Sequence, residues 1–414
     1  MLNIEPVLGR IYHPVLHRLR CKNERRLVKK AIDGRISSGN LVGESSGRKK
    51  RIYIDLSDVF FNDKGTGIQR VSKNISKNLL DLTTAYEVKN VYFKGTWYFS
   101  CDGGEEIDFC RGDIFFVLDQ PINEVRTNFD LFLHLMKNGV KVVSFFHDLI
   151  PLTHSNFCDQ GYVKDFKKFL SKILFFSEII CNSKSTADEL KAFLAENPKV
   201  KRNPNLKISY SLLGSDFSSL KKIESKSSAN SFGFEKSEIN FLMVSTVEPR
   251  KMYTQVVKAF NILWGKGLPV SLWIVGRRGW LSEKTFKLIE ENPHFSRELI
   301  WYSNGISDDE LSTLYEKCDV VLFASIAEGF GLAVAEGAYF KKPLILRDIP
   351  VFREIADDNA FYFSGTEAED LSAKIEEWLE LYKNNSHPKS DKIRLLSWKD
   401  CSQKVLEILE GGEK

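Results

Sequence analysis

The stretch "ASIAEGFGLAVAEGAYFKKPLILRD" (residues 324–348) places two glutamates, Glu328 and Glu336, eight positions apart around a Gly-Phe-Gly turn. The residues before it, "DVVLFAS", predict a buried strand, and the apolar run that starts near Leu332 predicts a helix. Glycines at such a junction let backbone N–H groups approach an anion, and the helix N-terminus adds unpaired N–H groups and a partial positive charge. The stretch therefore predicts a phosphate-binding turn at the carboxyl end of a strand, where open α/β sheets bind ligands.

The two glutamates suit hydroxylated groups on either side of a bound phosphate. Glu336 falls about one turn inside the expected helix, where its carboxylate can accept two hydrogen bonds from a vicinal diol such as a ribose. Glu328 falls on the loop, where it can contact another hydroxylated group beyond the phosphates. One nucleotide-sugar would satisfy all three elements. The alternative is that both acidic residues only complement the dipole of the helix N-terminus.

Short apolar strands alternate with helices in two parts of the chain. In the first part, strands are expected at 51–58, 113–119, 141–148 and 178–183. In the second part, they are expected at "INFLMVSTV", "VSLWIVG", "ELIWYS", "DVVLFAS" and "KPLILRD". This alternation predicts parallel βαβ units, and strands rich in Val, Ile and Phe fit sheets that are covered on both faces. Neither part has GxGxxG after its first strand, so a nicotinamide-binding Rossmann domain is not expected.

The length and composition suit a globular protein of two domains. The chain has 414 residues, of which 43% are hydrophobic and 28% charged. The expected division is a basic N-terminal extension (1–49), a first Rossmann-like domain on the acceptor side (50–220), a polar linker (221–238), a second Rossmann-like domain that binds the nucleotide-sugar (239–395) and a C-terminal helix that crosses back to the first domain (396–414).

Several classes of protein are disfavoured by what the sequence lacks. There is no apolar run of the length of a membrane helix, and the N-terminus lacks the pattern of a signal peptide. The seven cysteines are irregularly spaced without a CxxC pair, which indicates a reduced, cytoplasmic chain. No zinc spacing and no Asp-x-Asp occur, so no metal ligand set is expected.

The positive charge is concentrated at the N-terminus. Residues 1–50 carry twelve Lys or Arg and four Asp or Glu, a net +8 in a chain of net +4, so the remainder has a net charge of −4. A basic nucleic-acid-binding domain is therefore not expected. The segment "HPVLHRLRCKNERRLVKKAI" predicts a basic amphipathic helix after Pro14, of the kind that lies on an anionic membrane. The alternative is a solvated or partner-binding arm, and in either case the core is not expected to need residues 1–49.

A second candidate site element follows the first strand of the second part. In "VSTVEPRKMYTQVVKAF" (244–260), Arg250 and Lys251 begin the next helical region. Two cations at the carboxyl end of a strand can bind a diphosphate, the arginine as a fork and the lysine as a point charge. The alternative is a solvated, charged turn.

The segments "STVEPRK", "IVGRRGW", "EGFGLAVAE" and "RDIPVFREI" together resemble the retaining glycosyltransferases of family GT4, which have the GT-B fold. The resemblance spans about residues 51–410, and the pair Glu328–Glu336 is its most specific motif. The chain is similar to the bacterial branch that builds O-antigen and capsular polysaccharides, which includes α-mannosyltransferases. The resemblance implies an α/β architecture in which two doubly wound domains face a cleft.

The resemblance also implies roles for residues of the second domain. Glu336 binds the nucleotide ribose, Lys251 holds the diphosphate, and Glu328 faces the donor hexose. The backbone amides that face the donor with Glu328 are those of Gly329, Phe330, Gly331 and Leu332. Many members of the family carry an arginine five residues before that lysine, and this chain has Thr246 there. We assign the missing charge to Arg250.

Two segments of the first domain are candidates for the opposite wall of the cleft. In "KGTGIQR", Gly65 and Gly67 resemble the loop that meets donor phosphates in GT-B enzymes, although an ordinary strand–helix turn fits equally well. Arg70 follows in the next helix and can reach an anion or stay solvated. In "FFHDLIPL", His147 ends a strand where the family commonly has a histidine close to the donor sugar, and Asp148 can orient its ring or contact the acceptor.

The expected function is metal-independent transfer of a hexose, with retention of configuration and without a cofactor, from a nucleotide-sugar to a lipid-linked oligosaccharide of a bacterial surface polysaccharide. GDP-mannose is the first choice of donor on branch resemblance; deoxyhexose donors and UDP-hexoses are alternatives. The expected location is cytoplasmic, peripheral on the inner face of the membrane. The rival hypotheses are a GT-B-fold nucleotide-sugar epimerase or sugar-phosphate synthase, and a non-catalytic polysaccharide-assembly scaffold.

Overall fold

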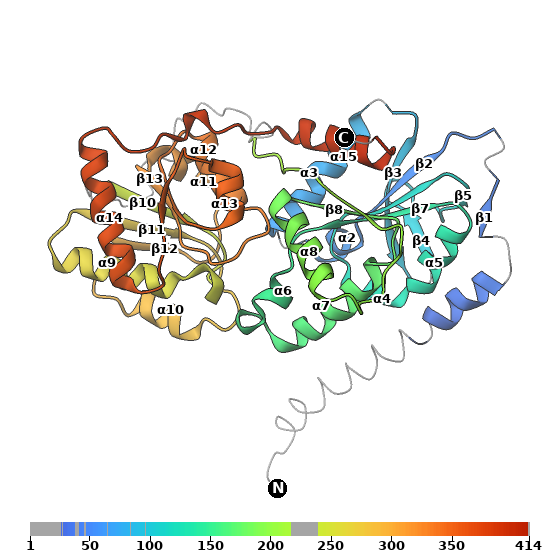
Figure 1. Cartoon of the computed structure of the whole chain (residues 1–414), viewed down its shortest axis with the longest axis horizontal. Helices are drawn as coiled ribbons and strands as arrows, with labels where there is room; N and C mark the ends of the chain where they lie inside the picture. Colours follow the sequence, from blue (N-terminus) through green and yellow to red (C-terminus); the bar gives the residue numbers. More distant parts are fainter. Residues whose placement is uncertain are drawn as a thin grey trace, which may run out of the picture.

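The computed structural model describes residues 26–412, apart from 27, 38–40, 45–46, 64, 83, 96 and 217–238. Within these residues, the chain forms two α/β domains that lie side by side (Figure 1). The first contains a seven-stranded sheet and the second a six-stranded sheet. The predicted fold class, two doubly wound Rossmann-like domains, is confirmed. The expected linker, 221–238, lies outside the described residues.

The sheet of the first domain has the order β4-β3-β2-β6-β7-β8-β9 and is parallel except for the β3–β4 pair. Its strands are β2 (Arg51–Asp55), β3 (Glu87–Lys94), β4 (Trp97–Ser100), β6 (Ile114–Val117), β7 (Lys141–Phe146), β8 (Glu178–Cys181) and β9 (Lys207–Tyr210). Its helices are α2 (Ser57–Asn62), α3 (Gly67–Asp81), α4 (Ile122–Thr127), α5 (Phe129–Lys137), α6 (Ile150–Thr153), the 3₁₀ helix η1 (Ser155–Phe157), α7 (Gln160–Ile173) and α8 (Lys184–Glu196). The chain order reverses between β2 and β6, and such a switch point leaves a crevice for a ligand.

The sheet of the second domain has the order β12-β11-β10-β13-β14-β15 and all of its strand pairs are parallel. Its strands are β10 (Ile239–Val244), β11 (Val270–Val275), β12 (Leu299–Tyr302), β13 (Val320–Phe323), β14 (Leu344–Arg347) and β15 (Phe361–Phe363). Its helices are η2 (Pro249–Lys251), α9 (Tyr253–Gly265), α10 (Glu283–Glu290), α11 (Asp308–Lys317), α12 (Leu332–Tyr339), α13 (Pro350–Ala356) and α14 (Ala368–Lys383). The switch point lies between β10 and β13. The segment with Lys251 directly follows β10, and the segment with Glu328 directly follows β13.

The chain returns to the first domain at its C-terminal end. After η3 (Ser390–Lys392), helix α15 (Trp398–Leu409) packs against α3 (Figure 1). Trp398 and Val405 are buried in one apolar cluster with Ile75 of α3. The ammonium group of Lys141 donates to the last carbonyls of α15, at 3.1 Å from Ile408 O and 3.0 Å from Leu409 O. The C-terminal end of the chain therefore ties the second domain to the first.

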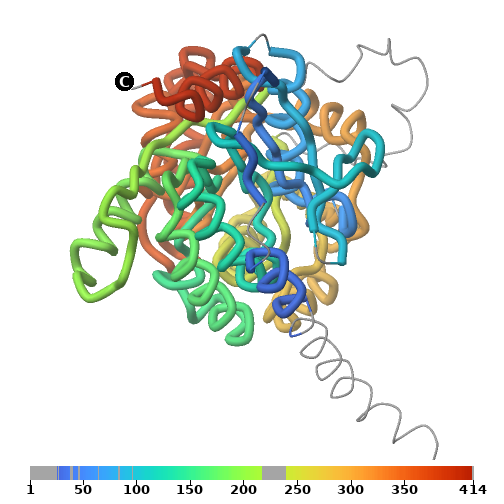
Figure 2. The backbone as a smooth tube through the Cα atoms, turned by 90° about the vertical axis from the view of Figure 1, so that its right-hand side faces the viewer, coloured from blue at the N-terminus to red at the C-terminus, as the bar shows by residue number. Residues whose placement is uncertain are grey.

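Part of the basic N-terminal segment belongs to the packed first domain. Residues 28–37 are helical and lie beside α5 (Figures 1 and 2), and Ile32 is only 1% exposed within the apolar core. The guanidinium of Arg35 pairs with Glu106 and lies 4.6 Å above the Trp97 ring. Strand β1 (Val42–Gly43) then pairs with β5 (Phe109–Cys110).

The expectation that the core does not need residues 1–49 is therefore wrong for residues 28–37, 42–43 and 48. Arg48 Nη2 lies 2.6 Å from the fully buried carboxylate of Asp113, so the segment contributes charge neutralisation as well as apolar contacts. Residues 1–25, which include the start of the proposed membrane helix, lie outside the described residues. Within the described part of the chain, no helix has the length and apolar character needed to cross a membrane.

We expect a chain that begins at residue 26 to unfold at the urea concentration of the full-length protein. A chain that begins at residue 48 should lose at least about 2 kcal/mol of unfolding free energy, because a buried Ile side chain alone contributes about 1.5–3 kcal/mol. Ile32→Ala in the full-length chain is the matched control and should reproduce most of this loss. Equal stability of all three chains would show that the segment is dispensable for the fold.

Candidate functional site

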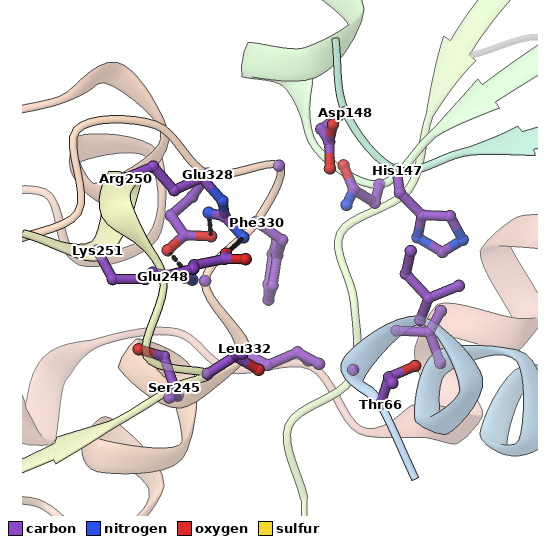
Figure 3. A pocket seen from close by; sticks show the side chains of 18 of the residues that line it. Thr66, His147, Asp148, Ser245, Glu248, Arg250, Lys251, Glu328, Phe330 and Leu332 are labelled. Carbon is purple, nitrogen blue, oxygen red and sulfur yellow. Dashed lines mark hydrogen bonds and ion pairs between the residues drawn. The ribbon is translucent and has the colours of Figure 1, made fainter. Parts of the chain in front are cut away.

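A cavity of about 610 Å³ lies between the two domains, where the carboxyl ends of both sheets meet. Both domains contribute to its wall, and Figure 3 shows His147 and Asp148 across from Arg250, Lys251 and Glu328. Ten of the residues predicted from the sequence line it: Gly67, His147, Thr246, Arg250, Lys251, Glu328, Gly329, Phe330, Gly331 and Leu332. The structure thus brings together the two separate candidate elements of the second domain and the histidine of the first.

Glu328 holds both candidate cations. Its Oε2 accepts a hydrogen bond from Arg250 Nη1 at 2.8 Å, and its Oε1 accepts one from Lys251 Nζ. Glu248 pairs with the same guanidinium at 2.6 Å. Burial alone would raise the pKa of Glu328, but Arg250 and Lys251 lower it to about 2. Glu328 is therefore ionised at neutral pH, and the cations are fixed against one wall of the cavity.

The glycines of the loop allow a close approach between the two domains. A Cβ on Gly329 would lie 2.0 Å from the carbonyl oxygen of His147, so no larger residue fits there. The Gly329 carbonyl accepts hydrogen bonds from Ser183 Oγ at 2.7 Å and from Thr186 Oγ1 at 3.0 Å, both in the first domain. Gly331 has φ of +100° at the N-terminus of α12, a left-handed conformation suited to glycine.

His147 lines the cavity, and its buried imidazole is neutral at pH 7. Burial lowers its pKa to about 4, although a hydrogen bond to the backbone of Leu118 acts in the opposite direction. Within the described residues, its buried Nε2 atom has no hydrogen-bond partner. The same is true of Oδ1 of Asn182, which follows β8 and lines the cavity. Asn182 was not among the predicted site residues; its position at the carboxyl end of a strand is the signal that identifies it.

The second glutamate of the motif, Glu336, lies beside the cavity rather than in its wall. Its side chain is buried in α12, and its Oε1 accepts a hydrogen bond from Arg70 Nη1 at 2.5 Å. Its Oε2 accepts one from the Tyr315 hydroxyl at 2.9 Å. Arg70 belongs to α3 of the first domain, so this ion pair crosses between the domains. A diol that binds to Glu336 must therefore displace or share the Arg70 contact.

The loop before α3 lies opposite Leu332. Gly67 faces it closely enough that a Cβ on Gly67 would lie 3.7 Å from Leu332 Cδ1. Thr66 caps α3 in a capping box with Gln69, which sets the direction of the loop. Gly65 has φ of +63° but does not line the cavity. The proposed contact of this loop with donor phosphates stays a prediction.

Thr246 follows β10 in the second domain, on the opposite side of the cavity from the loop before α3. It lines the cavity beside Gly279, where an added Cβ would come within 2.9 Å of Thr246 Cγ2. Its side chain offers a hydroxyl where the resemblance expects an arginine. The neighbouring wall already carries Arg250 and Lys251, so positive charge is available without an arginine at position 246. The assignment of that charge to Arg250 stays a prediction.

The two facing Rossmann-like domains form the GT-B fold. Residues 224–393, which include most of the second domain, match the family model described as "Glycosyl transferases group 1". Sucrose-phosphate synthase from Thermosynechococcus elongatus has a similar structure, with a TM-score of 0.63 at 12% identity, covering 87% of this chain and 98% of that one. At this identity the likeness shows the fold alone.

Two curated mannosyltransferases are similar to the chain in sequence. The chain is 35% identical over 383 residues to the serotype-specific mannosyltransferase WbdA of Escherichia coli. The aligned region covers 87% of this chain and 46% of that protein. It is 24% identical over 173 residues to the O-antigen chain mannosyltransferase B of Escherichia coli, covering 40% of this chain and 44% of that protein. The chain thus spans less than half the length of these relatives.

The buried His147 should make stability depend on pH. Because its folded pKa of about 4 is below its ordinary value of 6.5, it favours the folded state fully above pH 6.5 and loses this contribution as the pH falls through 4. We expect the difference in unfolding free energy between wild type and His147→Gln to shrink by roughly 3 kcal/mol from pH 7 to pH 4. Urea unfolding at several pH values measures it; parallel curves would contradict the buried, neutral state.

The Arg70–Glu336 pair predicts opposite effects of two substitutions on nucleotide binding. If Glu336 binds a ribose, Glu336→Ala should weaken binding about 10-fold or more, because a lost hydrogen bond to a charged partner is worth about 1.5–3 kcal/mol. Arg70→Ala should tighten binding a few-fold, because the nucleotide no longer has to displace the guanidinium. Calorimetry with nucleoside diphosphates measures both. Weaker binding by Arg70→Ala would instead show that Arg70 itself holds the nucleotide.

Proposed function

We propose that the chain transfers a hexose from a nucleotide-sugar, with GDP-mannose as the first choice, to a growing, lipid-linked bacterial surface polysaccharide. The proposal includes retention of configuration and independence of metals and cofactors. The observation that carries it is the cluster of Arg250, Lys251 and Glu328 beside the N-terminus of α12, facing the other domain across the cavity. Both relatives are mannosyltransferases, which supports the choice of sugar.

The chemistry follows from where charge develops. As the glycosidic bond breaks, negative charge grows on the phosphate oxygens of the leaving nucleoside diphosphate. Arg250 and Lys251, with the amides that begin α12, are fixed before the reaction and stabilise this charge without solvent reorganisation. They supply positive charge of the kind that a metal ion supplies in other transferases.

Glu328 has the wrong surroundings for a nucleophile. Both of its carboxylate oxygens accept hydrogen bonds from cations, and its pKa of about 2 makes it a weak base. We therefore assign it to positioning the cations and contacting the donor hexose. The leaving phosphate is then the base that takes the proton from the acceptor hydroxyl, on the same face of the sugar, which fits retention.

The rival hypotheses make different demands on this site. A sugar-phosphate synthase needs additional cations for the phosphate of its acceptor. A non-catalytic scaffold needs no preserved site, whereas here the predicted donor-side residues Arg250, Lys251 and Glu328 form a buried, fully paired cluster. The contact of residues 1–49 with an anionic membrane, and a cytoplasmic location on its inner face, stay predictions.

The test is a panel of nucleotide-sugars incubated with the purified full-length protein, with and without a lipid-linked oligosaccharide. We expect release of nucleotide from one donor, read by mass spectrometry, and the largest rate with GDP-mannose. Lys251→Ala and Arg250→Ala should each lower turnover by about 100-fold or more, because the charge that they stabilise is largest in the transition state.

Lys266→Ala is the matched control, because Lys266 is an exposed cation that pairs with Glu376 far from the cavity, and it should turn over like wild type. Thermal unfolding confirms that the variants are folded. No nucleotide release from any donor would favour the scaffold. A wild-type rate for Arg250→Ala would mean that Thr246 or another group takes the expected charge.

A further inference from the structure

Part of the cavity wall is aromatic rather than charged. Two exposed aromatic side chains line the cavity, Trp280 from the second domain at 44% exposure and Tyr162 from the first at 38%. The indole N–H of Trp280 donates to the carbonyl of Phe157 across the domain boundary at 2.9 Å. Because its polar atom is already bonded, what Trp280 offers to a ligand is the apolar surface of its ring.

Two carboxylates of the first domain, those of Asp148 and Asp159, line the same cavity as these rings. Asp148 Oδ1 accepts a hydrogen bond from the Ile150 amide at 3.1 Å, and Asp159 Oδ1 accepts one from the Tyr162 amide at 2.9 Å. Each therefore has its direction set by its own backbone. Within the described residues, the second carboxylate oxygen of each accepts no hydrogen bond, so both can accept one from a ligand. Figure 3 shows Asp148 on the opposite side of the cavity from Glu328 and its cations.

The charges of the wall indicate what kind of ligand fits beside the donor. Four carboxylates line the cavity, those of Asp148, Asp159, Glu248 and Glu328, against the two cations Arg250 and Lys251. Both cations pair with Glu328 or Glu248, and they are the groups that the donor diphosphate would use. Within the described wall, no further lysine or arginine remains for a phosphate on the second substrate.

We propose that Trp280, Tyr162, Asp148 and Asp159 form the subsite for the acceptor, and that they select an uncharged saccharide unit. This inference rests on the proposed glycosyltransferase function. The C–H face of a hexose ring is apolar and packs on an aromatic ring, while its hydroxyl groups donate hydrogen bonds to carboxylates. A pocket with apolar rings and a few directed polar groups is the usual construction of a small-molecule site.

The subsite also predicts what the acceptor cannot be. A sugar phosphate would place a second anion next to Asp148 and Asp159, where like charges repel it. The terminal sugar that receives the hexose must therefore be neutral, and any phosphate that links the glycan to a lipid must lie outside the cavity. The charges of the wall therefore favour a neutral acceptor over the phosphorylated acceptor of a sugar-phosphate synthase.

The experiment measures binding of saccharide probes by the full-length protein in the presence of GDP. The uncharged probes are methyl α-mannoside and the α-linked mannobioses, and the charged probe is mannose 6-phosphate. We expect at least one mannobiose to bind, and mannose 6-phosphate to bind at least 5-fold more weakly. Trp280→Ala should weaken the binding of that mannobiose at least 5-fold, and Trp280→Phe should restore most of it.

Leu281→Ala is the matched control, because Leu281 is the neighbouring residue, is 55% exposed and does not line the cavity. It should bind the mannobiose like wild type. The affinity for GDP should be the same in all variants, since the subsite lies apart from the nucleotide. Asp148→Asn tests the charge argument and should reduce the discrimination against mannose 6-phosphate.

The proposal is overturned if no uncharged probe binds, if mannose 6-phosphate binds as tightly as the mannobioses, or if Trp280→Ala leaves mannobiose affinity unchanged. It is also overturned if Trp280→Ala weakens GDP binding instead, because the ring would then contact the nucleobase. Failure of the proposed function has a different signature: the wild-type protein would release no nucleotide from any donor of the panel, whatever its affinity for mannobioses.

Discussion

The cleft depends on one close backbone contact, between Gly329 and the carbonyl oxygen of His147. A side chain at position 329 would collide with that oxygen, because its Cβ would lie 2.0 Å away. The contact is held by Ser183 and Thr186, whose hydroxyl groups both donate to the Gly329 carbonyl. Glu354 of α13 adds three hydrogen bonds of 2.6–2.7 Å to the first turn of α8. The distance between the two sheets is thus set at the site itself.

The sequence was sufficient to predict the parts of the site that lie within one strand–helix turn. Arg250 and Lys251 follow β10, Glu328 follows β13, and these strands are neighbours, so their carboxyl ends must meet. The cross-domain pairing of Arg70 with Glu336 could not be predicted, because 266 residues separate them and no local pattern records the contact. Asn182 was missed because an asparagine after a strand is equally typical of an ordinary turn.

The N-terminal segment shows the limit of periodicity as evidence. Val28, Ile32 and Ile36 recur at intervals of four and form an apolar stripe, which serves equally for packing on protein or on lipid. The structure shows Ile32 buried in the first domain, with Val28 and Ile36 packed against the same core. The ion pairs distinguish packing on protein from packing on lipid. Lys29 pairs with Asp130 and Arg35 with Glu106, and only the folded first domain brings these partners within reach.

Under the proposed metal-independent function, the carboxylate of Glu328 has a second role besides contacting the donor sugar. Two cations that are placed to stabilise a leaving group must stay buried when no donor is present, and an uncompensated buried charge costs several kcal/mol. Glu328 and Glu248 neutralise them through ion pairs within the second domain. Under the proposed function, the donor phosphates take over part of this pairing. Glu328 therefore keeps the two cations in place, in addition to its proposed contact with the donor sugar.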